Sequence, residues 1–116
     1  MTEASGNGSH ASGYWTIAKG GAQTVIGSFN IEDVNSEYAF IIGNGIKPDP
    51  SGTLTWDDNA QQSNAFTVDW NGEVTAKSIQ LDNNTKLEAI YDETTQTTSL
   101  NITLDGTTVS FTASEL

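Results

Sequence analysis

The sequence predicts an all-β protein, and three observations carry that prediction. Glycine recurs every seven residues near the N-terminus, at Gly6, Gly13, Gly20 and Gly27. The second half of the chain alternates apolar and polar side chains, which is the period of a β-strand. The turn-forming pairs Asn71-Gly72 and Asp105-Gly106 separate these alternating runs. We therefore expect strands throughout, and no helix within the glycine repeats.

The glycine heptads predict a stack of short parallel strands. A small aliphatic residue stands two positions before each glycine, at Ala4, Ala11, Ala18 and Val25. A coiled coil needs large apolar residues at two positions per heptad, and each interior glycine costs a helix about 1 kcal/mol. Each heptad instead predicts a short strand of about four residues and a turn in which glycine supplies backbone freedom. Two heptads then make one coil of a parallel β-roll, and each strand pairs with its equivalent in the next coil.

Alternation within these strands predicts which side chains point outward. The small residue before each glycine points into the roll, and its neighbours point away from it. The expected outward residues are His10, Ser12, Ile17, Lys19, Thr24, Ile26, Phe40 and Ile42. They become more apolar toward Gly43, where the repeat returns as residues 39–43. Exposed Ile and Phe on a repeating face predict a partner surface, which trimerisation would cover.

From Asn64 onward the longer alternating runs predict an antiparallel meander. Phe66, Val68 and Trp70 share one face of the first hairpin, so we expect Trp70 in the core. Residues 85–91 are ambiguous between a strand and a helical turn, and the strands that follow favour a strand. The meander has too few large apolar residues for a core of its own, so we expect a β-prism shared by three copies.

Composition excludes several functions. The 116 residues include 15 acidic and 4 basic side chains, for a net charge of −11. This charge excludes nucleic-acid binding and disfavours an anionic membrane surface. No cysteine is present, which removes disulfides and thiolate chemistry. We expect no signal peptide, because no basic region followed by an apolar run begins the chain. We also expect no transmembrane segment, since the longest nearly apolar run is residues 38–43.

The sequence offers few candidates for chemistry, and each has a plainer explanation. His10 lacks an evident nucleophile and orienting partner, although a ring of three such residues in a trimer could hold an ion. Asp57 and Asp58, with Asn59, offer oxygen ligands suited to calcium without full loop spacing, as does the turn at residues 82–84. Solvated turn residues explain both runs. We expect neither a metal site nor a cofactor.

Two further groups bear on carbohydrates. Paired carboxylates among Asp57, Asp58, Asp69 and Glu73 could suggest glycoside hydrolysis, but such pairs arise by composition in an acidic chain. The sequence contains no Arg to clamp acidic sugars, and we expect no enzyme. Tyr14, Trp15 and Trp56 are aromatic residues expected in turns or loops, where they could stack on sugar rings or pack between chains.

The repeats also carry a family resemblance. The heptads, with the segments at residues 9–13 and 16–20, resemble the head repeats of YadA-type trimeric adhesins. The later motifs at residues 30–33, 38–45 and 63–72 resemble a module of tail-fibre and other appendage proteins of tailed phages. The resemblance covers roughly residues 2–76. The insertion at residues 48–62 and the C-terminal part depart from the pattern.

The resemblance implies a homotrimeric fibre segment used in host attachment. We expect a left-handed parallel β-roll over residues 1–45, an exposed loop over 46–63, and a trimerising meander over 64–116. The expected partners are two further copies, other virion or fibre proteins, and a host cell-surface glycan or protein receptor. The expected location is the virion surface, on a tail or head appendage. Two alternatives remain: a fragment of a bacterial trimeric autotransporter adhesin, and an accessory domain of a polysaccharide-degrading appendage.

Overall fold

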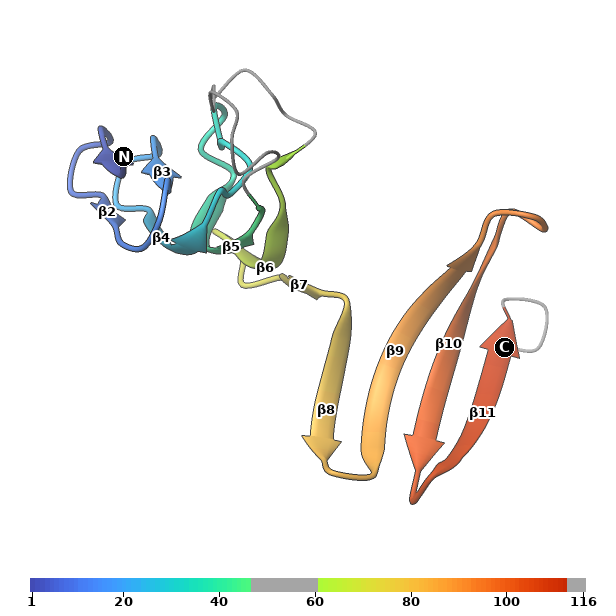
Figure 1. The fold of residues 1–116 in the computed structure, drawn as a ribbon. Helices are drawn as coiled ribbons and strands as arrows, with labels where there is room; N and C mark the ends of the chain where they lie inside the picture. Colours follow the sequence, from blue (N-terminus) through green and yellow to red (C-terminus); the bar gives the residue numbers. More distant parts are fainter. Residues whose placement is uncertain (47–60, 113–116) are drawn as a thin grey trace. The chain divides into compact units, whose positions relative to one another are not determined.

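The computed structural model describes residues 1–46 and 61–112, and the chain divides into two units, Met1–Thr75 and Ala76–Leu116. The described residues form eleven β-strands and no α-helix (Figure 1). The predicted all-β class is therefore confirmed. The three sheets of two, five and four strands are open.

The N-terminal unit contains seven strands. Four of them follow the heptads: β1 (Glu3–Ala4), β2 (His10–Ala11), β3 (Ile17–Ala18) and β4 (Thr24–Ser28). Three longer or later strands complete the unit: β5 (Tyr38–Asn44), β6 (Asn64–Asp69) and β7 (Val74–Ala76).

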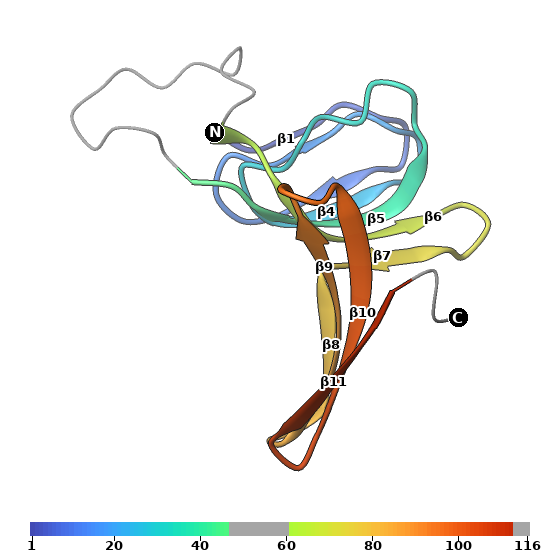
Figure 2. The same ribbon diagram turned by 90° about the vertical axis from the view of Figure 1, so that its right-hand side faces the viewer.

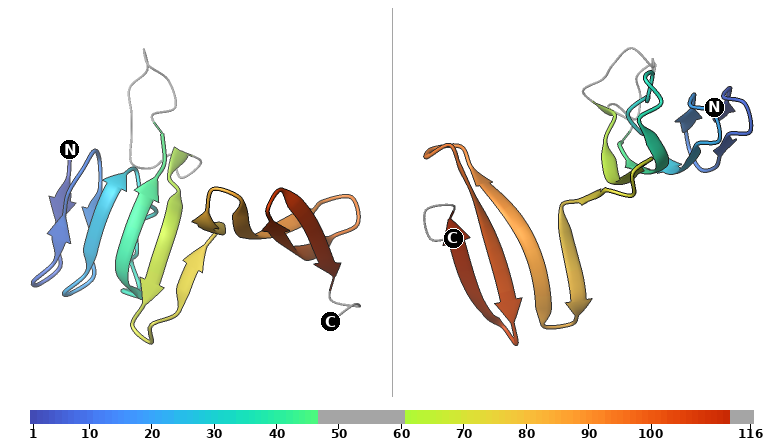
Figure 3. Two further views of the ribbon diagram at one scale, coloured as in Figure 1. Left: turned by 90° about the horizontal axis from the view of Figure 1, so that it is seen from below. Right: turned by 180° about the vertical axis from the view of Figure 1, so that it is seen from behind.

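Equivalent strands pair in parallel, as the heptads predict. Glu3 of β1 pairs with Ile17 of β3, and His10 of β2 pairs with Thr24 of β4, so each partner lies two heptads further along the chain. Strands β1 and β3 form the first stack, and β2 and β4 form the second. Strand β5 continues the second stack in parallel with β4. Strand β6 then joins β5 antiparallel, and β7 returns beside β6. Figure 2 shows the chain winding repeatedly between the two stacks, and the left panel of Figure 3 shows β4 to β7 side by side.

The small core lies between the stacks. Ala18, Val25 and Ile41 are completely buried, with Ala11 and Tyr38 packed against them. The inward positions of Ala11, Ala18 and Val25 match the prediction, whereas Ala4, on the outermost strand β1, is exposed. The prediction for Ile17 is wrong: this residue is buried, because the chain after β4 passes beside it.

The repeated glycines are required by close backbone approach, and at Gly13 and Gly27 also by positive φ angles of 116° and 97°. A Cβ added to Gly6 would overlap the carbonyl oxygen of Gly20, and one added to Gly13 would overlap that of Gly27. Gly27 in turn lies against the carbonyl of Gly43. A side chain at these positions would therefore push adjacent coils apart.

The C-terminal unit is a single antiparallel sheet in the order β8-β9-β10-β11. Its strands are β8 (Ser78–Asp82), β9 (Thr85–Asp92), β10 (Thr97–Leu104) and β11 (Thr107–Thr112). The predicted meander and the strand at residues 85–91 are confirmed. None of its described residues is buried, because a sheet of one layer leaves both faces in solvent.

Strands β6 and β7 lie with the N-terminal unit, whereas the sequence places the start of the meander at residue 64. The reason is the register: Phe40 pairs with Val68 and Ile42 with Phe66, so β6 extends the sheet of β5. The boundary between the two units therefore falls within β7, between Thr75 and Ala76.

Candidate interaction surfaces

The C-terminal sheet has one apolar face. Cross-strand pairing aligns Ile79 with Leu87, Leu87 with Ile102, and Ile102 with Val109. A second row aligns Ala89, Leu100 and Phe111. With Tyr91 and Leu104 on the same side by alternation, these rows make up the C-terminal apolar face: Ile79, Leu87, Ala89, Tyr91, Leu100, Ile102, Leu104, Val109 and Phe111. Ile79 is 51% exposed and Tyr91 is 59% exposed, so no other part of the C-terminal unit covers this face.

The opposite face of the same sheet is polar, with Ile90 as an exception. Lys86 and Glu88 form an ion pair of 3.2 Å across this side, and the hydroxyls of Thr103 and Thr108 lie 2.9 Å apart. A sheet with one apolar and one polar face normally packs its apolar face on another layer.

The sheet of β4, β5 and β6 has a second surface of this kind, the N-terminal apolar face. It consists of Ile26, Phe40, Ile42, Phe66 and Val68, all half-buried on the side away from the core. The rings of Phe40 and Phe66 meet edge to face at 6.3 Å. The predicted outward direction of Ile26, Phe40 and Ile42 is confirmed.

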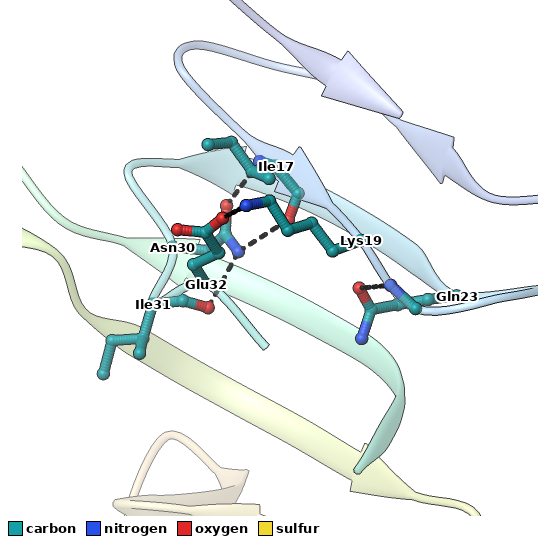
Figure 4. A network of polar contacts seen from close by, with 7 residues as sticks. Ile17, Lys19, Gln23, Asn30, Ile31 and Glu32 are labelled. Atoms are coloured by element: carbon teal, nitrogen blue, oxygen red, sulfur yellow. Dashed lines mark hydrogen bonds and ion pairs between the residues drawn. The ribbon is translucent and has the colours of Figure 1, made fainter. Parts of the chain in front are cut away.

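The segment after β4 closes the first stack of strands with a side chain (Figure 4). The amide N–H of Ile17 donates to Asn30 Oδ1 at 2.8 Å, and Asn30 Nδ2 donates to the carbonyl of Ile17 at 3.0 Å. The same nitrogen also donates to the carbonyl of Ile31. Fully buried Asn30 thus satisfies the free edge of β3 as a neighbouring strand would. In the sequence, the motif at residues 30–33 carries only a family resemblance, and nothing there indicates this role of Asn30.

The rest of the motif fixes the same segment. Glu32 forms an ion pair with Lys19, which raises the pKa of Lys19 above its usual range, chiefly through the hydrogen bond to Glu32. Buried Asp33 accepts hydrogen bonds from Gln23 Nε2 at 2.6 Å and from the amide of Tyr38 at 2.9 Å. These contacts make the motif a structural closure of the stack.

Two of the three aromatic candidates, Tyr14 and Trp15, lie against the same ring. Tyr14 meets Phe29 edge to face at 5.4 Å, and Trp15 stacks on the same ring at 6.1 Å. Phe29 is buried, Trp15 is half-buried and Tyr14 is 56% exposed, so Tyr14 and Trp15 pack around a shared aromatic core. The third candidate, Trp56, lies outside the described residues.

The polar candidates that the structure describes form no recognisable metal centre. His10 is exposed on β2, and Asp57 and Asp58 lie outside the described residues. Within residues 1–46 and 61–112, no three His, Asp or Glu side chains gather as a metal site. Asp82 instead stabilises its own turn: the backbone N–H of Asn84 donates to it at 2.8 Å, which with the Thr85 hydroxyl lowers the pKa of Asp82.

Trp70 is not in the core, and that prediction is wrong. The hairpin turn begins at Trp70, because Asp69 already closes it: its backbone N–H donates to the carbonyl of Glu73, and its Oδ1 accepts from the amides of Asn71 and Glu73. The indole is therefore 51% exposed, with Nε1 donating to the carbonyl of Ser36 at 2.9 Å. It lines a pocket of ≈ 410 Å³ formed by Glu37, Tyr38, Asp69, Trp70, Asn71, Glu73 and Thr75.

Comparison with known proteins returned no matching family model, curated protein or solved structure. No helix within the described parts of the chain is long and apolar enough to cross a bilayer.

Proposed function

We propose that this chain is a structural subunit of a homotrimeric attachment fibre, in which three copies share a core built from their C-terminal apolar faces. The C-terminal apolar face carries the proposal. A soluble monomer rarely exposes a contiguous apolar patch of this kind, and the contrast with the polar opposite face favours this side as the one that packs on a partner.

The apolar area left exposed on this face is large enough to offset the cost of assembly. Full burial of a Val, Leu, Ile or Phe side chain is worth about 1.5–3 kcal/mol, so a half-exposed one retains about 1 kcal/mol to gain. Summed over the face, this gain is comparable to the cost of association, about 4–15 kcal/mol. The N-terminal apolar face adds a second area of the same character. In the predicted β-prism, three copies turn their C-terminal apolar faces toward a common axis. Each copy then covers the apolar faces of the other two.

The N-terminal unit supplies the stiffness of such a fibre. Parallel pairing of strands two heptads apart, with glycine backbones in contact, supports the parallel β-roll expected for residues 1–45. In a stack of this kind each coil contacts mainly its neighbours, so length can be added without a larger core.

The attachment role follows from the same assembly. Three weak contacts on one trimer multiply into useful avidity, so the subunit needs no catalytic centre. Together with the resemblance to phage appendage proteins, this favours a place on a virion surface, where the fibre meets other virion proteins and a host glycan or protein receptor.

The test is the mass of the purified chain in solution, measured by multi-angle light scattering and sedimentation. We expect three copies per particle, with little dissociation at micromolar concentration. A monomer or a dimer at those concentrations contradicts the proposal. Binding of the trimer to intact host cells then tests the attachment role separately from the assembly.

A further inference from the structure

We propose that the pocket beside Trp70 binds an uncharged pyranose ring of a cell-surface glycan. The inference deepens the attachment role by naming a ligand class. The pocket itself lies within one chain, so its test does not require the trimer. It also moves the expected carbohydrate contact away from Tyr14 and Trp15, whose rings pack on Phe29.

The indole of Trp70 is presented as a fixed platform. It follows β6 at the start of the turn, and the hydrogen bond from its Nε1 to the carbonyl of Ser36 ties it to the loop before β5. Half of its surface remains exposed. A large aromatic ring held in this way can stack on the C–H face of a sugar without first losing much conformational freedom.

The charged groups around the indole are hydrogen-bond acceptors. Asp69 Oδ1 is used by the turn, but Oδ2 and the carboxylates of Glu37 and Glu73 have no hydrogen-bond or cationic partner among the described residues. Sugar hydroxyls donate readily to carboxylates, and such charge-assisted bonds are stronger than neutral ones. A few convergent polar groups beside an aromatic wall are typical of small-molecule sites, whose volumes are about 300–1,000 Å³.

The charge of the site selects against acidic sugars. Three carboxylates line the pocket, and the whole chain carries a net charge of −11. Uronic and sialic acids would meet repulsion without a compensating cation. A free amino sugar would be attracted by charge alone. A glucosamine oligomer therefore distinguishes ionic adsorption from recognition of the sugar ring.

The experiment follows the indole N–H resonances of the full-length, ¹⁵N-labelled chain during titration. Three tryptophans are present, and the Trp70 resonance is assigned with the variant Trp70→Phe. The probes are oligosaccharides of neutral hexoses, deoxyhexoses and N-acetylhexosamines, with a galacturonic acid oligomer and a glucosamine oligomer as charged counterparts. Concentrations up to ~10 mM detect a Kd of about 1 mM.

We expect at least one neutral oligosaccharide to shift the Trp70 resonance selectively and the galacturonic acid oligomer to leave it unchanged. Trp70→Ala should weaken that binding about tenfold or more, and Glu37→Gln and Glu73→Gln should each weaken it by a smaller factor. Tyr14→Ala removes an aromatic ring of similar exposure elsewhere and should leave the affinity unchanged.

Two results would overturn the inference. One is that no neutral oligosaccharide moves the Trp70 resonance. The other is that only the glucosamine oligomer does so and salt abolishes the effect, which would show ionic adsorption. Light scattering on the same samples keeps the two proposals separate, because sugar binding by a monomer would refute the trimer and leave this site standing.

Discussion

Asn30 pairs with Ile17 as a third strand of the first stack would, donating to its carbonyl and accepting from its amide. One side chain thereby ends a two-stranded sheet that would otherwise leave buried backbone groups unpaired. The consequence is that the stability of the stack depends on a residue outside every strand.

Removing this pairing should be costly. Asn30→Ala leaves a buried amide and carbonyl of Ile17 without partners, and we expect a loss of at least about 2 kcal/mol in the free energy of unfolding. Asn30→Asp should be worse, because it places a carboxylate against two carbonyl oxygens. Urea denaturation at fixed protein concentration measures both. Asn35→Ala, on the exposed turn nearby, serves as control and should change the value by no more than about 0.5 kcal/mol.

Gly6 and Gly8, both in the first coil, distinguish the effect of close backbone approach from that of backbone strain. Gly6 lies outside the left-handed region, but its Cβ would overlap Gly20, whereas Gly8 has a φ of 71° and open space around it. We expect Gly6→Ala to cost more than ~3 kcal/mol, beyond usual overpacking, and Gly8→Ala about 1–2 kcal/mol. Thermal unfolding by circular dichroism compares them, and equal losses would contradict the close-approach explanation.

Adjacent residues of β11 test the assembly face. Val109 lies on the C-terminal apolar face and is 48% exposed, and Ser110 lies on the polar face of the same strand. Val109→Asp should convert the trimer to monomers by burying three unpaired charges at the shared core. Ser110→Asp adds the same charge and should leave the mass unchanged. Dissociation by both variants, or by neither, would show that this face is not the interface.

The turn after β8 predicts a pH dependence. Hydrogen bonds from Asn84 and Thr85 hold the pKa of Asp82 below its ordinary value of 3.8. The stabilising contribution of Asp82 is therefore present above that ordinary value and is lost as the pH falls through the lowered one. A ¹³C NMR titration of the carboxyl group should show the depressed pKa. Asp82→Asn should weaken the dependence of stability on pH in this acidic range and leave the turn itself formed.

Local pattern predicted the strands well. The spacing of Gly6, Gly13 and Gly20 indicated two heptads per coil, and the observed pairing of Glu3 with Ile17 has that spacing. Alternation likewise placed Leu100 and Ile102 on one face. These features depend on periodicity, which a single sequence displays directly.

Two positions depart from the alternation. Alternation predicts that Ile17 faces outward, and a contact with the distant residue Asn30 explains its burial. Alternation also predicts Trp70 in the core, because it continues the pattern of Phe66 and Val68. The signal that contradicts this is Asp69, whose side chain caps the turn and ends the strand one residue earlier. An Asp two residues before Asn71-Gly72 and four before Glu73 was the available clue.

The contacts between glycine backbones make the spacing of the coils independent of the side chains on the surface. Where Gly13 lies against Gly27, and Gly27 against Gly43, the vertical spacing of the coils is set by main-chain atoms alone. Outward positions such as His10 and Thr24 can then change identity without altering the spacing of the layers. A fibre built in this way is free to vary the chemistry it presents while its framework stays the same.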